Sequence, residues 1–258
     1  MAWPSDPLIY EINTCLWLGE LSRRYRRPIT LKDVPEQEWD AVAQLRIDAV
    51  WFMGVWERSP LGLAIVRSNR GLMADLVRAL PDLTEQDLGG SPYCVRRYVV
   101  DAAFGGPTGL AEARMQLAWR GLQLMLDFVP NHVAPDHPWV GEHPEYFMPG
   151  DRGDLERDPA SFMERNGRVY ACGRDPYFPA WSDVLQLNAF DPGLRRAAID
   201  TVLRIADQCD GVRCDMAMLL INSIFERTWA KRAGPKPHTE YWTDLIPVVH
   251  TSHSYLFL

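Results

Sequence analysis

Residues 121–132 read GLQLMLDFVPNH, a mostly apolar run that ends in acidic, amide and imidazole side chains. A strand whose apolar residues do not alternate with polar ones is typical of a parallel sheet buried on both faces. Residues 49–55 (AVWFMGV) form a second such run. Residues 211–215 (GVRCD) predict a short strand that carries two charged side chains, Arg213 and Asp215. These three runs predict neighbouring strands of a parallel sheet.

Helical segments alternate with the strands. Residues 8–12 predict a first strand, and residues 254–258 predict the start of a fifth. Helices are predicted at 35–45, 109–120, 192–208, 221–232 and 241–251. A closed barrel of this kind has eight strands in about 250 residues. The alternation therefore predicts an α/β fold: the N-terminal portion of a (β/α)8 TIM barrel, with strands one to four and the start of strand five.

Three regions follow from this arrangement. Residues 1–130 hold barrel strands one to three, with a long loop after strand two that includes a helical patch at 70–80. Residues 131–193 are rich in Pro, Gly and aromatic residues, and they predict an irregular subdomain inserted after strand three. Residues 194–258 hold the third helix, the fourth strand and helix, and the truncated start of strand five.

Composition excludes several classes of partner. The chain has 258 residues, of which 47% are apolar, and a net charge of −7. A surface that tracks nucleic acid needs clustered Lys and Arg, so no nucleic acid partner is expected. No apolar stretch approaches the roughly 20 residues of a membrane span, so no membrane association is expected. The first residues show no secretory signal, which predicts a cytoplasmic protein. None of the five cysteines is spaced as a zinc or redox pair, which predicts reduced thiols.

Candidate functional residues lie where strands end, because the carboxyl ends of barrel strands carry the reactive groups. Arg213 and Asp215 are two residues apart on one strand, so their side chains share a face. A guanidinium there could keep Asp215 ionised as a nucleophile, or the pair could simply be a buried ion pair that closes a barrel layer. His132, after Asn131, could donate to a substrate hydroxyl, bind a metal or cap the strand.

The two strand ends together resemble signature motifs of glycoside hydrolase family 13, the α-amylase family. Residues 127–132 (DFVPNH) are similar to its first motif, and residues 211–217 (GVRCDMA) are similar to its second. Further similarity covers nearly the whole chain, at residues 8–13 (LIYEIN), 91–93 (SPY), 98–100 (YVV) and 181–188 (WSDVLQLN).

The resemblance implies a role for each matching residue. Asp215 would be the nucleophile that forms a covalent glycosyl intermediate, and Arg213 would position it. His132 and Tyr93 would contact the sugar, with Tyr93 stacking its ring. Asp127 would complete this substrate-binding group as an inner carboxylate. The implied substrate is an α-glucan or α-glucoside, cleaved by hydrolysis or transferred to another sugar.

The resemblance implies no required cofactor, although Asn131 matches a position that often binds a structural calcium. Gln186 stands where calcium-binding members usually carry Asp, and a neutral amide is a weaker ligand for this cation. Two further departures are Met218-Leu219, where many amylases carry Lys-His, and Arg97, where Asp is common. Typical starch-amylase specificity is therefore not expected.

A retaining mechanism needs a second carboxyl group, which the family places as a Glu at the end of strand five. Residues 254–258 resemble that strand before the Glu, so we expect a fragment of a longer active enzyme, itself inactive and poorly soluble or dimeric. The alternative is a catalytically inactive remnant that binds sugar or another protein. Four other carboxyl groups lack the strand-end position and are expected to be solvated surface charges: Glu57, Asp183, Glu226 and Glu240.

Overall fold

A four-stranded parallel sheet forms the centre of the protein, in a computed structural model that describes residues 3–84 and 88–258. Its strands are β1 (Ile9–Asn13), β2 (Ala49–Met53), β5 (Gln123–Phe128) and β10 (Gly211–Cys214), in the order β1-β2-β5-β10. All six residues of β5 are buried, as the absence of alternation in its mostly apolar sequence predicts. All four strands lie where the sequence predicts them.

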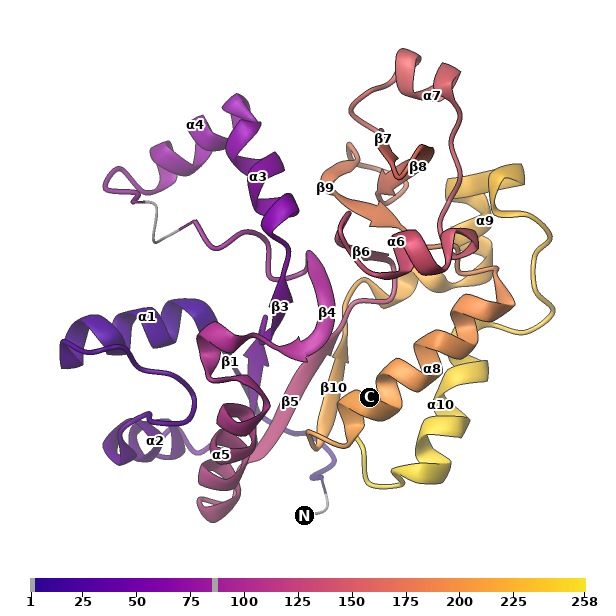
Figure 1. The fold of residues 1–258 in the computed structure, drawn as a ribbon. Coiled ribbons are helices and arrows are strands. Elements are labelled where there is room, and N and C mark those ends of the chain that lie inside the picture. Colours follow the sequence, from indigo (N-terminus) through magenta and orange to yellow (C-terminus); the bar gives the residue numbers. More distant parts are fainter. Residues whose placement is uncertain (1–2, 85–87) are drawn as a thin grey trace.

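The helices of the sheet layer are α1 (Thr14–Tyr25), α2 (Glu36–Ala43), α5 (Gly106–Trp119), α8 (Pro192–Ala206), α9 (Asn222–Trp229) and α10 (Tyr241–Ser252). Figure 1 shows α2, α5, α8 and α10 around the sheet, while the long excursions of the chain lie at the other end of the molecule. No helix was predicted from the sequence at the position of α1. Its boundaries are marked by Asn13, whose side chain accepts a hydrogen bond from the Leu16 N–H, and by Arg26 in the left-handed conformation.

The long loop after β2 is more ordered than its composition predicts. It contains β3 (Trp56–Arg58), α3 (Pro60–Ser68), α4 (Arg70–Ala79), β4 (Val95–Val100) and the short 3-10 helix η1 (Ala102–Phe104). The predicted helical patch at 70–80 is confirmed as α4. Strands β3 and β4 pair antiparallel, so the loop leaves and returns to the sheet as a two-stranded ribbon.

The insert at 131–193 is a small antiparallel sheet, so the prediction of an irregular subdomain is wrong. Its elements are β6 (His132–Val133), α6 (Trp139–Glu142), η2 (Pro144–Tyr146), α7 (Arg152–Arg157), β7 (Phe162–Arg165), β8 (Arg168–Gly173) and β9 (Trp181–Gln186). The strand order is β6-β9-β8-β7. Asn166 and Gly167 join β7 to β8 with φ of 51° and 73°, and Asn-Gly is the usual sequence of such a tight turn.

The remaining elements follow β10. The chain forms η3 (Ala217–Leu220) before α9 and η4 (Ala230–Ala233) after it. The predicted fifth strand is a single parallel bridge between Phe257 and Gly211, with the Val212 N–H donating to the Phe257 carbonyl at 2.7 Å. Phe257 therefore lies beside β10, as a neighbouring parallel strand would.

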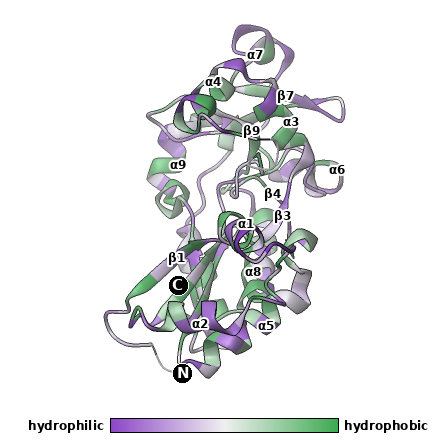
Figure 2. Ribbon diagram, turned by 90° about the vertical axis from the view of Figure 1, so that its left-hand side faces the viewer, coloured by the Kyte–Doolittle hydropathy of each residue, from purple (hydrophilic) through white to green (hydrophobic). Residues whose placement is uncertain are grey.

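One large apolar core fills the space between the parallel sheet and the helices, and it includes Trp39, Phe52 and Leu124. A smaller cluster around Phe147 and Tyr170 packs the insert. Figure 2 shows that the helices carry both hydrophobic and hydrophilic residues, as expected when one face packs on the sheet. All five cysteines are free, as predicted. No helix among the described residues is long and apolar enough to cross a membrane.

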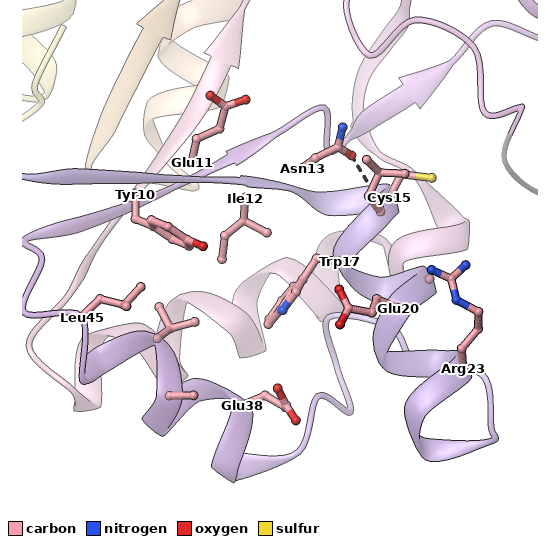
Figure 3. Close-up of a pocket in the computed structure, with 14 residues that line it drawn as sticks. Tyr10, Glu11, Ile12, Asn13, Cys15, Trp17, Glu20, Arg23, Glu38 and Leu45 are labelled. Carbon is pink, nitrogen blue, oxygen red and sulfur yellow. Dashed lines mark hydrogen bonds between the residues drawn. The ribbon is translucent and has the colours of Figure 1, made fainter. Parts of the chain in front are cut away.

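The outer edge of β1 is open. Within the described residues β1 pairs only with β2, and its Ile9 and Tyr10 remain 40% and 44% exposed. A cavity of about 600 Å³ lies here between β1, α1 and α2 (Figure 3). Figure 3 also shows Glu11 pointing to the opposite face of β1 from Tyr10 and Ile12. This open edge with exposed apolar residues agrees with the expectation for a partial barrel.

Candidate active site

Asp127 and Asp215 come together because their strands are neighbours. In the parallel pairing of β5 with β10, Arg213 lies opposite Asp127. Asp215 follows two residues later, and its N–H donates to the Phe128 carbonyl at 2.7 Å. Met216, with φ of 50°, then turns the chain away from the sheet. Both carboxyl groups thus lie at the carboxyl end of the parallel strands, where a barrel places reactive groups.

Arg213 links the two carboxyl groups. Its Nη1 donates to Asp215 Oδ1 and lies 3.9 Å from Asp127 Oδ1. The guanidinium also lies between two aromatic rings, 4.8 Å from the centroid of Trp51 and 5.4 Å from that of Tyr93. Such contacts hold a planar guanidinium in one orientation. The predicted contact between Arg213 and Asp215 is confirmed.

Burial and the ion pair act in opposite directions on Asp215. The side chain is only 6% exposed, and burial raises the pKa of Asp215, while the charge and hydrogen bond of Arg213 lower it. A nucleophile must be ionised, so Arg213 is the group that favours the reactive form.

Asp127 is fully engaged by its neighbours. Trp51 Nε1 donates to one carboxyl oxygen at 3.0 Å, and the Gly54 N–H donates to the other at 2.9 Å. Burial raises the pKa of Asp127 to about 7, against the Gly54 N–H, Arg213 and Trp51, which lower it. Asp127 therefore acts as an internal anchor for the ends of β2 and β10.

A cavity of about 290 Å³ opens beside Asp215. Its lining includes Tyr93 from the loop before β4, His132 on β6, Trp181 and Asp183 on β9, and Met216. The cavity thus lies between the parallel sheet and the insert. Tyr93 and His132 were expected to meet the substrate, and the structure brings both of them to the cavity with Asp215.

Asp183 was expected to be a solvated surface charge, and this expectation is wrong. The residue is partly buried and lines the cavity, and burial raises the pKa of Asp183. Trp181 lies two residues earlier on β9, and side chains two apart on a strand share a face. In the sequence, Trp181 lies in the segment 181–188 that resembles the family but was given no role, since no local pattern shows which face of β9 meets the cavity.

His132 is a neutral ring at pH 7. Burial lowers the pKa of His132 to about 4, although the Tyr93 backbone opposes this shift. Its Nδ1 lies 3.3 Å from Asn131 Nδ2, and its ring centroid lies 5.2 Å from that of Trp181. A neutral imidazole in this position can exchange hydrogen bonds with an uncharged ligand but offers no positive charge.

The donor set around Asn131 does not fit a calcium ion. Gln186, which is fully buried, directs its Nε2 at three oxygens: the Asn131 carbonyl at 2.9 Å, Asn131 Oδ1 at 3.0 Å and the Leu187 carbonyl at 3.0 Å. An amide nitrogen carries hydrogens and cannot ligate a cation, so Gln186 satisfies the oxygens that a cation would need. Across residues 3–84 and 88–258, no group of three or more His, Cys, Asp or Glu side chains could hold a metal.

The other carboxyl groups considered from the sequence have partners away from this cavity. Glu57 forms ion pairs with Arg96 and Arg97, so Arg97 has a structural contact at its unusual position. Glu226 pairs with Lys236, and Glu240 accepts a hydrogen bond from the Asn222 N–H. Met218 and Leu219 lie in η3, where Met218 is 54% exposed and Leu219 is buried.

Comparison with known proteins finds similarity to α-amylases in both sequence and fold. No protein-family model matches the sequence. The chain is 26% identical over 231 residues to the α-amylase MalA of Haloarcula japonica, a match that covers 87% of this chain and 27% of that protein. An α-amylase of Lactobacillus plantarum has the same fold, with a TM-score of 0.61 and 18% identity over 97% of this chain and 44% of its own.

A further structure, described as a family GH13_31 enzyme, matches with a TM-score of 0.63 and 14% identity over 99% of this chain and 46% of its own. The chain therefore spans less than half the length of these relatives. The parallel sheet matches part of their barrel. The sequence similarity and the shared fold relate the chain to the α-amylase family, glycoside hydrolase family 13, whose motifs the two strand ends resemble.

Proposed function

We propose that this chain carries the nucleophile half of the active site of a retaining enzyme that acts on α-glucans or α-glucosides. The observation that carries the proposal is the environment of Asp215, which directly follows β10, pairs with Arg213 and lines a cavity. Tyr93 and Trp181 in the same lining offer aromatic surface to the apolar face of a sugar ring. His132 offers a neutral polar group beside them.

The reaction would proceed in two displacement steps. An oxygen of Asp215 attacks the anomeric carbon while the bond to the glycosidic oxygen breaks, and that oxygen takes a proton from a second carboxylic acid. Water or a sugar hydroxyl then attacks the glycosyl ester and gives its proton to the second carboxylate, which frees Asp215. Arg213 stabilises the carboxylate before the first step and after the second.

The second carboxylic acid has to lie about 5 Å from the nucleophile. Asp127 is unsuited, because both of its oxygens accept hydrogen bonds from Trp51 and Gly54. Asp183 lies on the inserted sheet and lacks the strand-end position that barrels use. We therefore propose that the acid comes from a part of the whole protein outside residues 1–258.

A glycosyl fluoride tests the role of Asp215 without that acid. Fluoride leaves with its bonding electrons and needs no proton, so 5-fluoro-α-glucosyl fluoride can react with a nucleophile alone. We expect mass spectrometry of the treated 258-residue chain to find one fluoroglucosyl group on the peptide that contains Asp215. Asp215→Asn should prevent labelling, whereas Glu164→Gln, which removes the carboxylate of an exposed residue on β7, should not.

Labelling of another residue would remove Asp215 from the nucleophile role. Glucan binding with no labelling would contradict the catalytic proposal and favour a sugar-binding remnant of the same fold. In the whole protein, Asp215→Asn should abolish turnover while glucan binding persists.

A further inference from the structure

The cavity beside Asp215 has a second carboxylate whose role the proposed reaction does not explain. Asp183 comes from β9 of the insert, whereas Asp215 follows β10 of the parallel sheet. Both side chains line the same cavity of about 290 Å³. Any ligand held against Asp215 in this space therefore lies within range of the charge on Asp183.

Asp183 has no protein partner that accounts for its position. No ion pair joins its carboxylate to a cation in the described parts of the chain, and Cys94 Sγ donates to its backbone carbonyl, at 3.1 Å, rather than to its side chain. Only its own N–H opposes the effect of burial on its carboxyl group. The neighbouring thiols, Cys94 and Cys172, stay neutral, because burial raises the pKa of each.

The other carboxylates of the insert that are at least partly buried have hydrogen-bond or ion-pair partners within the protein. Each of them accepts hydrogen bonds from a helix end or turn, or pairs with an arginine or hydroxyl: Asp136, Asp154, Asp175 and Asp191. A partly desolvated carboxylate without such partners is costly to the fold. Its position in a cavity wall is explained if a ligand supplies the missing donors.

The charge of the cavity restricts what that ligand can be. None of the described residues that line it is a lysine or arginine, and His132 is neutral. Arg213 is committed to Asp215. A phosphate or carboxylate on the ligand would therefore face Asp183 without a free cation, while hydroxyl groups could donate to it in charge-assisted hydrogen bonds.

We propose that Asp183 is a specificity residue of this cavity: it accepts hydrogen bonds from the hydroxyls of an uncharged sugar unit and excludes sugars that carry phosphate or carboxylate groups. Trp181, on the same face of β9, supports the ring whose hydroxyls Asp183 holds. The inference rests on the proposed function, because it takes the ligand at Asp215 to be a sugar.

Two ligands and two variants test this inference on the 258-residue chain. Dissociation constants are measured by calorimetry for maltotriose and for maltotriose with a 6-phosphate on its non-reducing unit. Asp183→Asn keeps the size of the side chain and removes its charge, and Glu164→Gln removes the same charge at an exposed position of β7. Circular dichroism checks folding, and removal of a partly buried charge at position 183 should leave the thermal midpoint unchanged or higher.

We expect wild type to prefer maltotriose. Asp183→Asn should weaken maltotriose binding about tenfold and strengthen binding of the phosphorylated ligand, whereas Glu164→Gln should change neither. If Asp215 is labelled by the glycosyl fluoride but Asp183→Asn binds both ligands as wild type does, only this inference fails. If wild type binds neither ligand and Asp215 is not labelled, the proposed function fails with it.

Discussion

Replacement of Gln186 by leucine should lower the free energy of unfolding by about 3 to 4 kcal/mol, because each buried hydrogen bond contributes about 1 kcal/mol. The Gln186 amide nitrogen shares its two hydrogens among three oxygens of Asn131 and Leu187 at 3.0 Å or less, and its Oε1 accepts from Asn131 Nδ2 and the Arg174 N–H, both at 3.3 Å, so the amide makes about four hydrogen bonds. Leucine has a similar volume but makes none of these hydrogen bonds. The Asn131 carbonyl keeps the Leu187 N–H as a donor at 3.0 Å, while the other groups lose their contact with Gln186. In urea, a slope of about 3 kcal/mol per molar converts the loss into a midpoint shift of about 1 M.

Gln37→Leu is the matched control. Gln37 is exposed and makes one side-chain hydrogen bond, to the Tyr25 hydroxyl at 2.9 Å, so its loss should shift the urea midpoint by less than about 0.3 M. Equal shifts for the two leucine variants would refute the reasoning that Gln186 organises a buried polar network.

Calcium provides a second measurement on the same network. Gln186→Glu would place a carboxylate among oxygens that now accept hydrogen bonds, and a cation could relieve that repulsion. We expect calcium to raise the urea midpoint of Gln186→Glu and to leave wild type unchanged. A calcium-dependent midpoint in wild type would show that a cation does bind at Asn131 and would contradict the fit described above.

Two further predictions concern single side chains. Arg26 ends α1 with φ of 53° and is exposed, so Arg26→Gly should raise the free energy of unfolding by about 1 kcal/mol. Arg23→Gly, inside α1, should lower the free energy of unfolding by about 1 kcal/mol. Urea unfolding of the two variants should therefore show shifts of opposite sign. The hydrogen bond from Arg232, followed by the Asp151 N–H and the charges of Arg232 and Arg157, lowers the pKa of Asp154 to about 2. Asp154 thus adds stability above its ordinary pKa of 3.8 that is lost as pH falls through about 2. Asp154→Asn should be less stable than wild type at pH 7, and urea midpoints should show that gap closing between pH 4 and 2; a constant gap would contradict the ion-pair explanation.

The main elements of the parallel sheet could be predicted from the sequence because a strand that is buried on both faces has mostly apolar residues without polar alternation. Residues 49–55 are an unbroken apolar run and residues 121–129 are a mostly apolar one, and the strands observed there differ from the predictions only at their ends. Arg213 and Asp215 were paired from their spacing alone, since side chains two apart on a strand share a face whatever surrounds them.

Two other elements have local sequence signals on which no prediction above was based. The Asn166-Gly167 dipeptide marks the hairpin between β7 and β8, although the surrounding composition favoured an irregular region. Asn13 before an amphipathic segment marks the start of α1 in the same way. Both signals are local and could have been found before the structure.

The amino-acid sequence alone determined the alternation of strands and helices and the strand ends that carry Asp127 and Asp215. Only the tertiary structure decided that Asp183 enters the cavity and that Gln186 satisfies Asn131, 55 residues away. The physical reason is the range of the interactions. The burial of a strand can be predicted from the residues next to each other along it. The environment of a polar side chain depends instead on which distant segments meet around it. Here the end of a barrel strand meets the inserted sheet.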